Sequence, residues 1–409
     1  MTDAEGVALA QQRPQQPNTQ GRLTVGILSL AQALAMTGVS IVTLTTGLAG
    51  AYLSDNPAFA TVPMAAQYVA TMFCTYPAAM LMRHYGRRFG FTLGQAFGFL
   101  GACLSAYALL QQSFALFLAA GVLLGVHNAF WGFYRFAAAE AADAAFKARA
   151  ISLVMAGGVL AAFAGPELAK LTRNLLAPVL FAGCYTVVAA LCVANIGLLQ
   201  FGRLPGAPAA APQMGGRTWQ QLLQDPRYLA AVAAGMASYG VMVLVMAATP
   251  LSMADCGLTF DDSAFVIEWH LLAMFTPSFF TGALIQRLGT TRIILIGFVL
   301  NAICMIANLS GTTLLNFWVG LVALGFGWNF MYVGATNLLT DTYRPEERDT
   351  AQATNDTMVF AAIALATFAS GALQQTWGWA AVNAIVALPL VFAGVAMLGL
   401  RAKPRPQNI

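Results

Sequence analysis

Residues 79–88 read AMLMRHYGRR, and residues 282–291 read GALIQRLGTT. The two stretches align at one offset that places Gly86 opposite Gly289, and basic residues gather at both. Each stretch follows a long apolar run, and glycine permits the tight bend that a short turn between antiparallel helices needs. The repeat therefore predicts that the chain contains two copies of one helical arrangement.

The composition indicates a membrane protein. The chain has 409 residues, of which 59% are hydrophobic and 9% charged, whereas a soluble domain carries roughly 25% charged residues. Its apolar runs reach the roughly 20 residues that a helix needs to cross a bilayer, and they lack the alternation of membrane β-strands. We therefore expect an all-α membrane protein with twelve transmembrane helices in the lipid bilayer. The expected spans are 24–51, 62–82, 89–110, 114–138, 150–170, 177–201, 228–249, 264–286, 293–310, 313–338, 352–373 and 380–400.

The basic residues predict the orientation of these spans. Of the 20 lysines and arginines, all but three would lie on the side of the two termini. Lys170 and Arg173 would lie on the other side, and Arg135 lies inside the fourth span. Because positive residues stay on the cytoplasmic side, both termini are expected to be cytoplasmic in a bacterial inner membrane. The net charge of +4 then reflects topology, and no nucleic acid is expected as a partner.

A segment rich in Gly, Pro and Ala divides the spans six plus six. The expected organisation is a disordered cytoplasmic tail (1–22), an N-terminal six-helix bundle (23–201), a cytoplasmic linker (202–227), a C-terminal six-helix bundle (228–400) and a second cytoplasmic tail (401–409).

With twelve spans, a six-plus-six division and a repeated loop, the chain resembles the major facilitator superfamily over essentially its whole length. That family carries a loop of the form Gly-x-Leu-x-Asp-Arg-x-Gly-Arg-Arg, whose acidic position holds Arg83 and Gln286 here. The resemblance implies the major facilitator fold, two bundles around a central cavity that opens alternately to each side. The candidate gating-loop residues are Arg83, Gly86, Arg87, Arg88, Gly282, Arg287 and Gly289. The alternative is that the arginines only anchor the loops at the membrane surface.

Residues 242–274 contain a second pattern. Met242 and Met246 form a Met-x-x-x-Met pair in the seventh span, and His270 and Met274 form a His-x-x-x-Met pair in the eighth. Residues four apart share a helix face, and both pairs are expected at similar depths in the outer half of the membrane. Thioethers and imidazole select a soft ion such as Cu(I). The competing interpretation is plain packing, because methionine is a common flexible core residue.

The two pairs together are similar to the pattern of a bacterial branch of the superfamily that imports copper and supplies assembly of cbb-type cytochrome oxidase. This resemblance implies an inner-membrane copper importer that works by alternating access, with copper as the transported ion and no permanently bound cofactor. It further implies partners among cytoplasmic or membrane copper-handling proteins. Met253, Cys256 and His127 would form a secondary metal path, although an interhelical hydrogen bond is the other explanation for His127.

Two other functions stay open. One is a carrier, such as an exporter, of small apolar organic compounds or drugs. A cavity lined by flexible Met side chains and by Phe and Trp would suit apolar ligands of varied shape. The other is a copper sensor on a carrier fold that transports nothing. No enzyme and no catalytic residue is expected, because no Ser-His-Asp order, Walker loop or dinucleotide fingerprint occurs. Arg135 is expected to pair with Glu140 or Asp356 at the cytoplasmic gate.

Overall fold

A computed structural model describes residues 19–143, 146–202, 204 and 216–401. Residues 1–18 and 402–409 of the predicted tails, and residues 203 and 205–215 of the predicted linker, therefore lie outside the described residues. Within these ranges every regular element is a helix. Nine of the helices described are long and apolar enough to cross a membrane, and a bent pair makes a tenth candidate. The prediction of an all-α membrane protein is confirmed.

The helices fall into two successive groups. The first contains α2 (Thr19–Leu53), η1 (Pro57–Phe59), α3 (Val62–Tyr85), α4 (Arg87–Leu110), α5 (Phe114–Trp131), α6 (Tyr134–Ala141), α7 (Lys147–Thr172) and α8 (Ala182–Gln200). The second contains α9 (Trp219–Leu222), α10 (Pro226–Asp255), α11 (Phe260–Phe275), α12 (Ser278–Leu288), α13 (Thr290–Leu309), α14 (Leu314–Thr340), η2 (Pro345–Glu347), α15 (Arg348–Ile385) and α16 (Ala387–Arg401).

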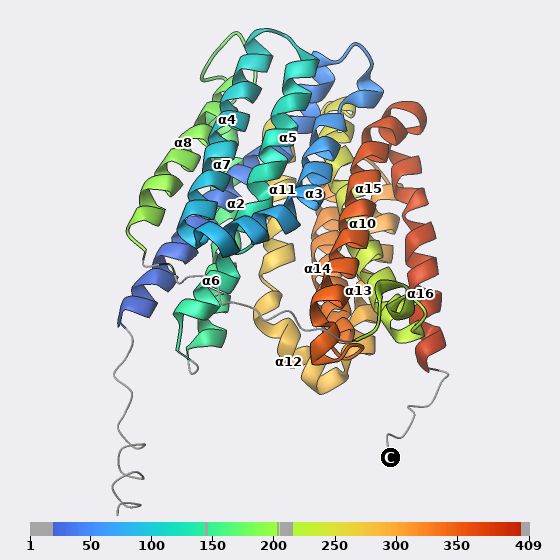
Figure 1. Ribbon diagram of the computed structural model, residues 1–409. Coiled ribbons are helices and arrows are strands. Elements are labelled where there is room, and N and C mark those ends of the chain that lie inside the picture. Colours follow the sequence, from blue (N-terminus) through green and yellow to red (C-terminus); the bar gives the residue numbers. More distant parts are fainter. Residues whose placement is uncertain (1–18, 144–145, 203, 205–215, 402–409) are drawn as a thin grey trace, which may run out of the picture.

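Each predicted span overlaps a described helix, but the fourth, eighth and twelfth spans are each divided between two helices. The fourth span is the pair α5 and α6, and the eighth is the pair α11 and α12, bent by 45°. The last two spans are contained in α15 and α16, because α15 turns back at Gly378, whose φ of 73° favours glycine. Figure 1 shows this reversal at the end of the molecule opposite the termini.

The seventh span is longer than predicted. Its helix α10 passes through Pro250 and ends at Asp255, because a membrane helix tolerates proline where neighbouring groups satisfy the freed backbone. At 1.5 Å per residue, Met246 and Met242 lie about 14 and 20 Å from that helix end, deeper than a helix ending at 249 would place them. The first span also begins earlier than predicted, at Thr19, so residues 19–22, predicted as part of a disordered tail, are helical.

The loop repeat noticed in the sequence is present in the backbone. Gly86 joins α3 to α4 with a φ of 88°, and Gly289 joins α12 to α13 with a φ of 87°. Residues with side chains rarely adopt this conformation, so glycine is required at both positions. The two halves therefore use the same backbone turn at equivalent places.

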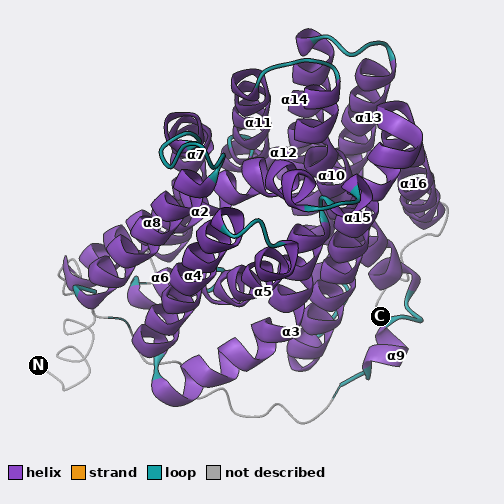
Figure 2. Cartoon of the chain, turned by 90° about the horizontal axis from the view of Figure 1, so that it is seen from above, coloured by secondary structure: helices purple, strands orange, loops and turns teal. Residues whose placement is uncertain are grey.

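The two halves pack side by side, which Figure 2 shows from above with α4 and α8 on one side and α13 and α16 on the other. Between the halves, α7 contacts α11, α3 contacts α15, and α2 contacts α10. At the end opposite the termini, the Thr61 hydroxyl donates to the Thr367 carbonyl (2.7 Å) and accepts from the Gly371 amide (3.1 Å). An ion pair between Arg173 and Asp261 (3.3 Å) joins the halves at the same end.

Candidate functional site

A cavity of about 400 Å³ lies between the two halves. Helices α2, α3, α5, α6 and α7 line it from the first half, and α10, α11, α14 and α15 line it from the second. Pockets that bind small organic molecules typically have volumes of about 300–1,000 Å³. The cavity is therefore large enough for a small organic molecule.

Three stacked or crossed aromatic rings form one wall of this cavity. The rings of Trp328 and Tyr332 on α14 lie nearly parallel, with centroids 5.3 Å apart and planes at 14°. Tyr239 on α10 meets both rings edge-on, at 5.1 Å from Trp328 and 4.7 Å from Tyr332. Phe275 on α11 packs against Trp328 at 6.3 Å. Because these rings hold one another, they present an ordered apolar surface to the cavity.

The predicted metal residues are only partly brought together. Met242, Met246 and Met274 all line the cavity. His270 does not: it is fully buried, and its Nδ1 atom lies 2.8 Å from the Leu321 carbonyl of α14. Residues four apart on a helix differ by about 40° in direction. Helix α14 packs closely on α11, because a Cβ at Gly325 of α14 would lie 2.6 Å from the His270 carbonyl. The difference of about 40° therefore turns His270 toward α14, while Met274 faces the cavity.

The predicted secondary path is spread over the molecule. Met253 is buried near the end of α10, and Cys256 is exposed just beyond that end. His127 lies in the other half, on α5, where its Nδ1 atom is 3.0 Å from the Gly94 carbonyl of α4. None of the three lines the central cavity. In the part of the chain that the structure describes, no three His, Cys, Asp or Glu residues cluster as metal ligands do.

Arg135 and Asp356 line the cavity from opposite halves. Among the described residues no ion pair joins Arg135 to an acid. The Glu140 carboxylate pairs instead with Arg87, and Asp356 accepts a hydrogen bond from the Asn355 amide at 3.0 Å. The predicted pairing of Arg135 is therefore wrong for this conformation, in which the two charged groups face the cavity from separate halves.

The predicted gating-loop residues lie at the end of the molecule that holds the termini. Arg83 and Arg287 are in the last turns of α3 and α12, and Gly282 lies within α12. Arg87 and Arg88 begin α4, where Arg88 donates to the Gly202 carbonyl. The loop of the first half is thus tied to a neighbouring segment of that half, and a gating role for either loop remains a prediction.

The aromatic wall was not predicted. Trp328 and Tyr332 are four residues apart in the tenth span, a spacing that places them on one helix face. Aromatic residues make up 11% of the chain, so one such pair does not stand out from the sequence.

Comparison with known proteins gives a consistent family. A model of the Major Facilitator Superfamily matches residues 230–409. The chain is 39% identical over 390 residues to the riboflavin transporter RfnT of Brucella anthropi, and the match covers 95% of this chain and 98% of that protein. It is 27% identical to each of two uncharacterized MFS-type transporters of Bacillus subtilis, YdeG and YddS. These matches cover 88% of this chain and 87% and 86% of the relatives.

These relatives correct the function predicted from the methionine pattern. The predicted function of copper import is wrong, because a relative matched over nearly the whole chain is a riboflavin transporter. The predictions of copper as substrate and of copper-handling proteins as partners are wrong for the same reason. The alternative prediction, a carrier of small organic compounds, is closer. The prediction that the protein is a carrier and not an enzyme is confirmed by the family model and the transporter relatives.

Proposed function

We propose that this chain, which belongs to the major facilitator superfamily, carries riboflavin or a closely related flavin across a bacterial inner membrane. The 39% identity to a riboflavin transporter over 95% of the chain supports this substrate class. The chain is a multi-pass membrane protein, and the distribution of basic residues favours cytoplasmic termini.

The observation that carries the proposal is the composition of the cavity wall. The isoalloxazine ring system of a flavin is flat, aromatic and uncharged, with an apolar dimethylbenzene end. Trp328, Tyr332 and Tyr239 offer aromatic faces and edges against which such a ring packs favourably. Met242 and Met246 add pliable, polarisable surface beside them. In this role the thioethers pack against an organic ring system.

The contacts between the halves support transport by alternating access. At the end opposite the termini, the halves are held together by Thr61 with Gly371 and by Arg173 with Asp261. Separation of the halves at that end requires these contacts to break. Arg135 and Asp356, which face the cavity from opposite halves, are placed to approach each other when the other end closes.

The test is uptake of radiolabelled riboflavin into proteoliposomes that contain the purified full-length protein. We expect saturable uptake above that of protein-free liposomes, which excess unlabelled riboflavin abolishes and excess ribose leaves unchanged. Uptake no greater than that of empty liposomes, together with no quenching of flavin fluorescence by the detergent-purified protein, would overturn the proposal.

A further inference from the structure

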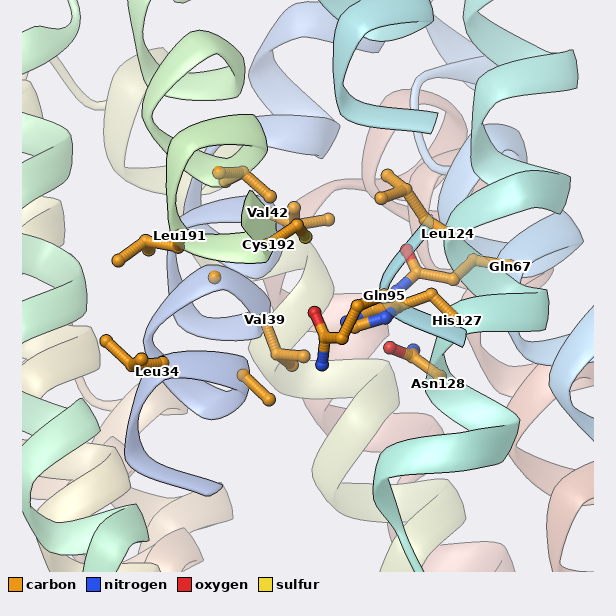
Figure 3. A pocket seen from close by; sticks show the side chains of 13 residues that line it. Leu34, Val39, Val42, Gln67, Gln95, Leu124, His127, Asn128, Leu191 and Cys192 are labelled. Atoms are coloured by element: carbon orange, nitrogen blue, oxygen red, sulfur yellow. The ribbon is translucent and has the colours of Figure 1, made fainter. Parts of the chain in front are cut away.

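A second, smaller pocket lies inside the first half, between α2, α3, α4, α5 and α8. In Figure 3 the polar ends of Gln67, Gln95, His127 and Asn128 gather on one side of it, while Leu34 and Leu191 lie on the other. The space is about 10 Å³, close to the volume that one water-sized group needs. It therefore has room for a single small polar group of a larger molecule, about the size of one water.

This pocket borders the central cavity. Val39 and Asn128 line both spaces, so these two side chains form the wall that the spaces share. A molecule bound in the central cavity with its polar edge toward Asn128 would place that edge at the pocket.

The hydrogen bond between His127 and Gly94 determines which ring nitrogen of His127 can accept a hydrogen bond from a ligand. Its Nδ1 atom lies 3.0 Å from the Gly94 carbonyl, and because a carbonyl only accepts, Nδ1 carries the hydrogen. In the neutral ring Nε2 is then an acceptor. The position depends on glycine, because a Cβ at Gly98 would lie 2.8 Å from Nδ1 of His127.

The neighbouring amides complete a set of donors and acceptors. Gln95 donates from Nε2 to the Tyr134 hydroxyl (2.8 Å), while its buried Oε1 atom has no partner among the described residues. The Asn128 Oδ1 atom accepts from the Trp131 indole N–H (3.0 Å), which leaves the amide nitrogen of Asn128 to donate. The His127 acceptor and the Asn128 donor together can meet a ligand that carries an N–H next to a carbonyl.

We propose that this pocket is the subsite for the imide edge of the flavin pyrimidine ring, an inference that rests on the proposed function. The imide presents an N–H between two carbonyls. The N–H enters the pocket and donates to Nε2 of His127, while one carbonyl stays at the shared wall and accepts from the Asn128 amide. The aromatic part of the ring system stays in the central cavity, against Trp328 and Tyr332. The subsite makes His127 and Asn128 specificity-determining residues.

The experiment compares riboflavin with 3-methylriboflavin, in which a methyl group replaces the imide hydrogen. Binding and proteoliposome uptake of both are measured for the full-length protein, for His127→Leu and for His270→Leu. His270 is the matched control because it is also buried and bonds a backbone carbonyl through the same ring nitrogen, yet lines neither space.

We expect the unmodified protein to prefer riboflavin by about tenfold or more, because loss of a buried hydrogen bond costs roughly that factor. His127→Leu removes the preference by weakening riboflavin binding, and His270→Leu keeps it. If His127→Leu does not reach the membrane, Asn128→Leu serves, and it should weaken both flavins by a similar factor.

Equal uptake of the two flavins by the unmodified protein, or an unchanged preference in His127→Leu, would overturn the subsite and leave the proposed function standing. Unchanged binding of both flavins in Asn128→Leu would also count against the subsite. No uptake of either flavin by the unmodified protein would instead contradict the proposed function.

Discussion

The two halves of the molecule repeat one helix order but face the cavity with different chemistry. The first half supplies the side-chain amides and aliphatic hydroxyls of the wall: Gln32, Ser40, Thr43, Thr71, Thr75 and Asn128. The second half supplies Trp328, two tyrosines, two phenylalanines and three methionines, with Asp356 as its one carboxylate in the lining. The internal repeat therefore preserves the helix arrangement, while the side chains that the two halves present to the cavity differ. The first half also contributes Tyr68, Trp131, Phe133 and Phe136, so aromatic rings border the cavity on both sides, while the amides and aliphatic hydroxyls of the lining come from the first half alone. Such a lining suits an amphiphilic planar substrate.

The halves also differ at the end that holds the termini. In the first half Arg87 pairs with Glu140, whose side chain is 27% exposed. In the second half Arg217 bonds the carboxylate of Glu347, which is 1% exposed, and also Asp225 and the Thr342 carbonyl. The Arg217 guanidinium holds the pKa of Glu347 at about 2, mainly through its hydrogen bonds. Because Arg217 bonds two carboxylates and a carbonyl, the second anchor is the stronger one.

The largest expected effect tests this difference in anchoring. Glu347→Gln should lower the free energy of unfolding at pH 7 by about 3 kcal/mol, since the pKa falls from 4.5 to about 2 on folding. A lowered pKa contributes stability above the unfolded value of 4.5 that is lost as the pH falls toward 2. Denaturant unfolding of the purified protein at pH 7 and near pH 3 measures this effect, which should shrink at the lower pH.

Glu140→Gln is the matched variant in the first half. Glu140 is the more exposed of the two acids and pairs with one arginine, so its loss should cost less than that of Glu347, about 1 kcal/mol. If the two variants lose equal stability at pH 7, the two anchors are equivalent and this part of the comparison fails.

The next effect tests the aromatic wall. Trp328→Ala should weaken riboflavin binding by roughly tenfold to a hundredfold, because stacking of a planar ring on an aromatic side chain contributes about 1–3 kcal/mol. Trp377→Ala is the control, because that indole is 71% exposed and lies outside the cavity. Quenching of flavin fluorescence on titration gives both affinities. An equal effect of the two variants would show that the wall does not bind the ring.

The smallest effect concerns the methionines that the second half adds to the wall. Met242→Leu should change riboflavin uptake by less than about threefold, because this exchange conserves apolar volume. Initial uptake rates in proteoliposomes, normalised to the amount of reconstituted protein, provide the measurement. A loss greater than tenfold would show that the sulfur itself is required, and the assignment of Met242 to apolar packing would be wrong.

Much of the fold could be predicted from the sequence. Apolar runs of sufficient length leave little choice but membrane helices, because backbone groups in lipid must be satisfied within the segment. The glycines at 86 and 289 marked the repeat, and both adopt the same positive φ. The breaks were harder to predict. The reversal at Gly378 and the passage of α10 through Pro250 depend on which neighbours surround each residue.

The candidate site, like the fold, could be predicted in part from the sequence. The amino-acid sequence by itself determined the helical membrane fold, the two-part repeat and the presence of soft and polar side chains within the spans. Only the tertiary structure decided which of those side chains face the cavity. His270 and Met274 share a helical spacing, yet the close approach of α14 buries one and leaves the other at the cavity wall. The spacing of residues along one helix fixes the directions in which their side chains point. The packing of the neighbouring helices decides what each side chain meets in that direction.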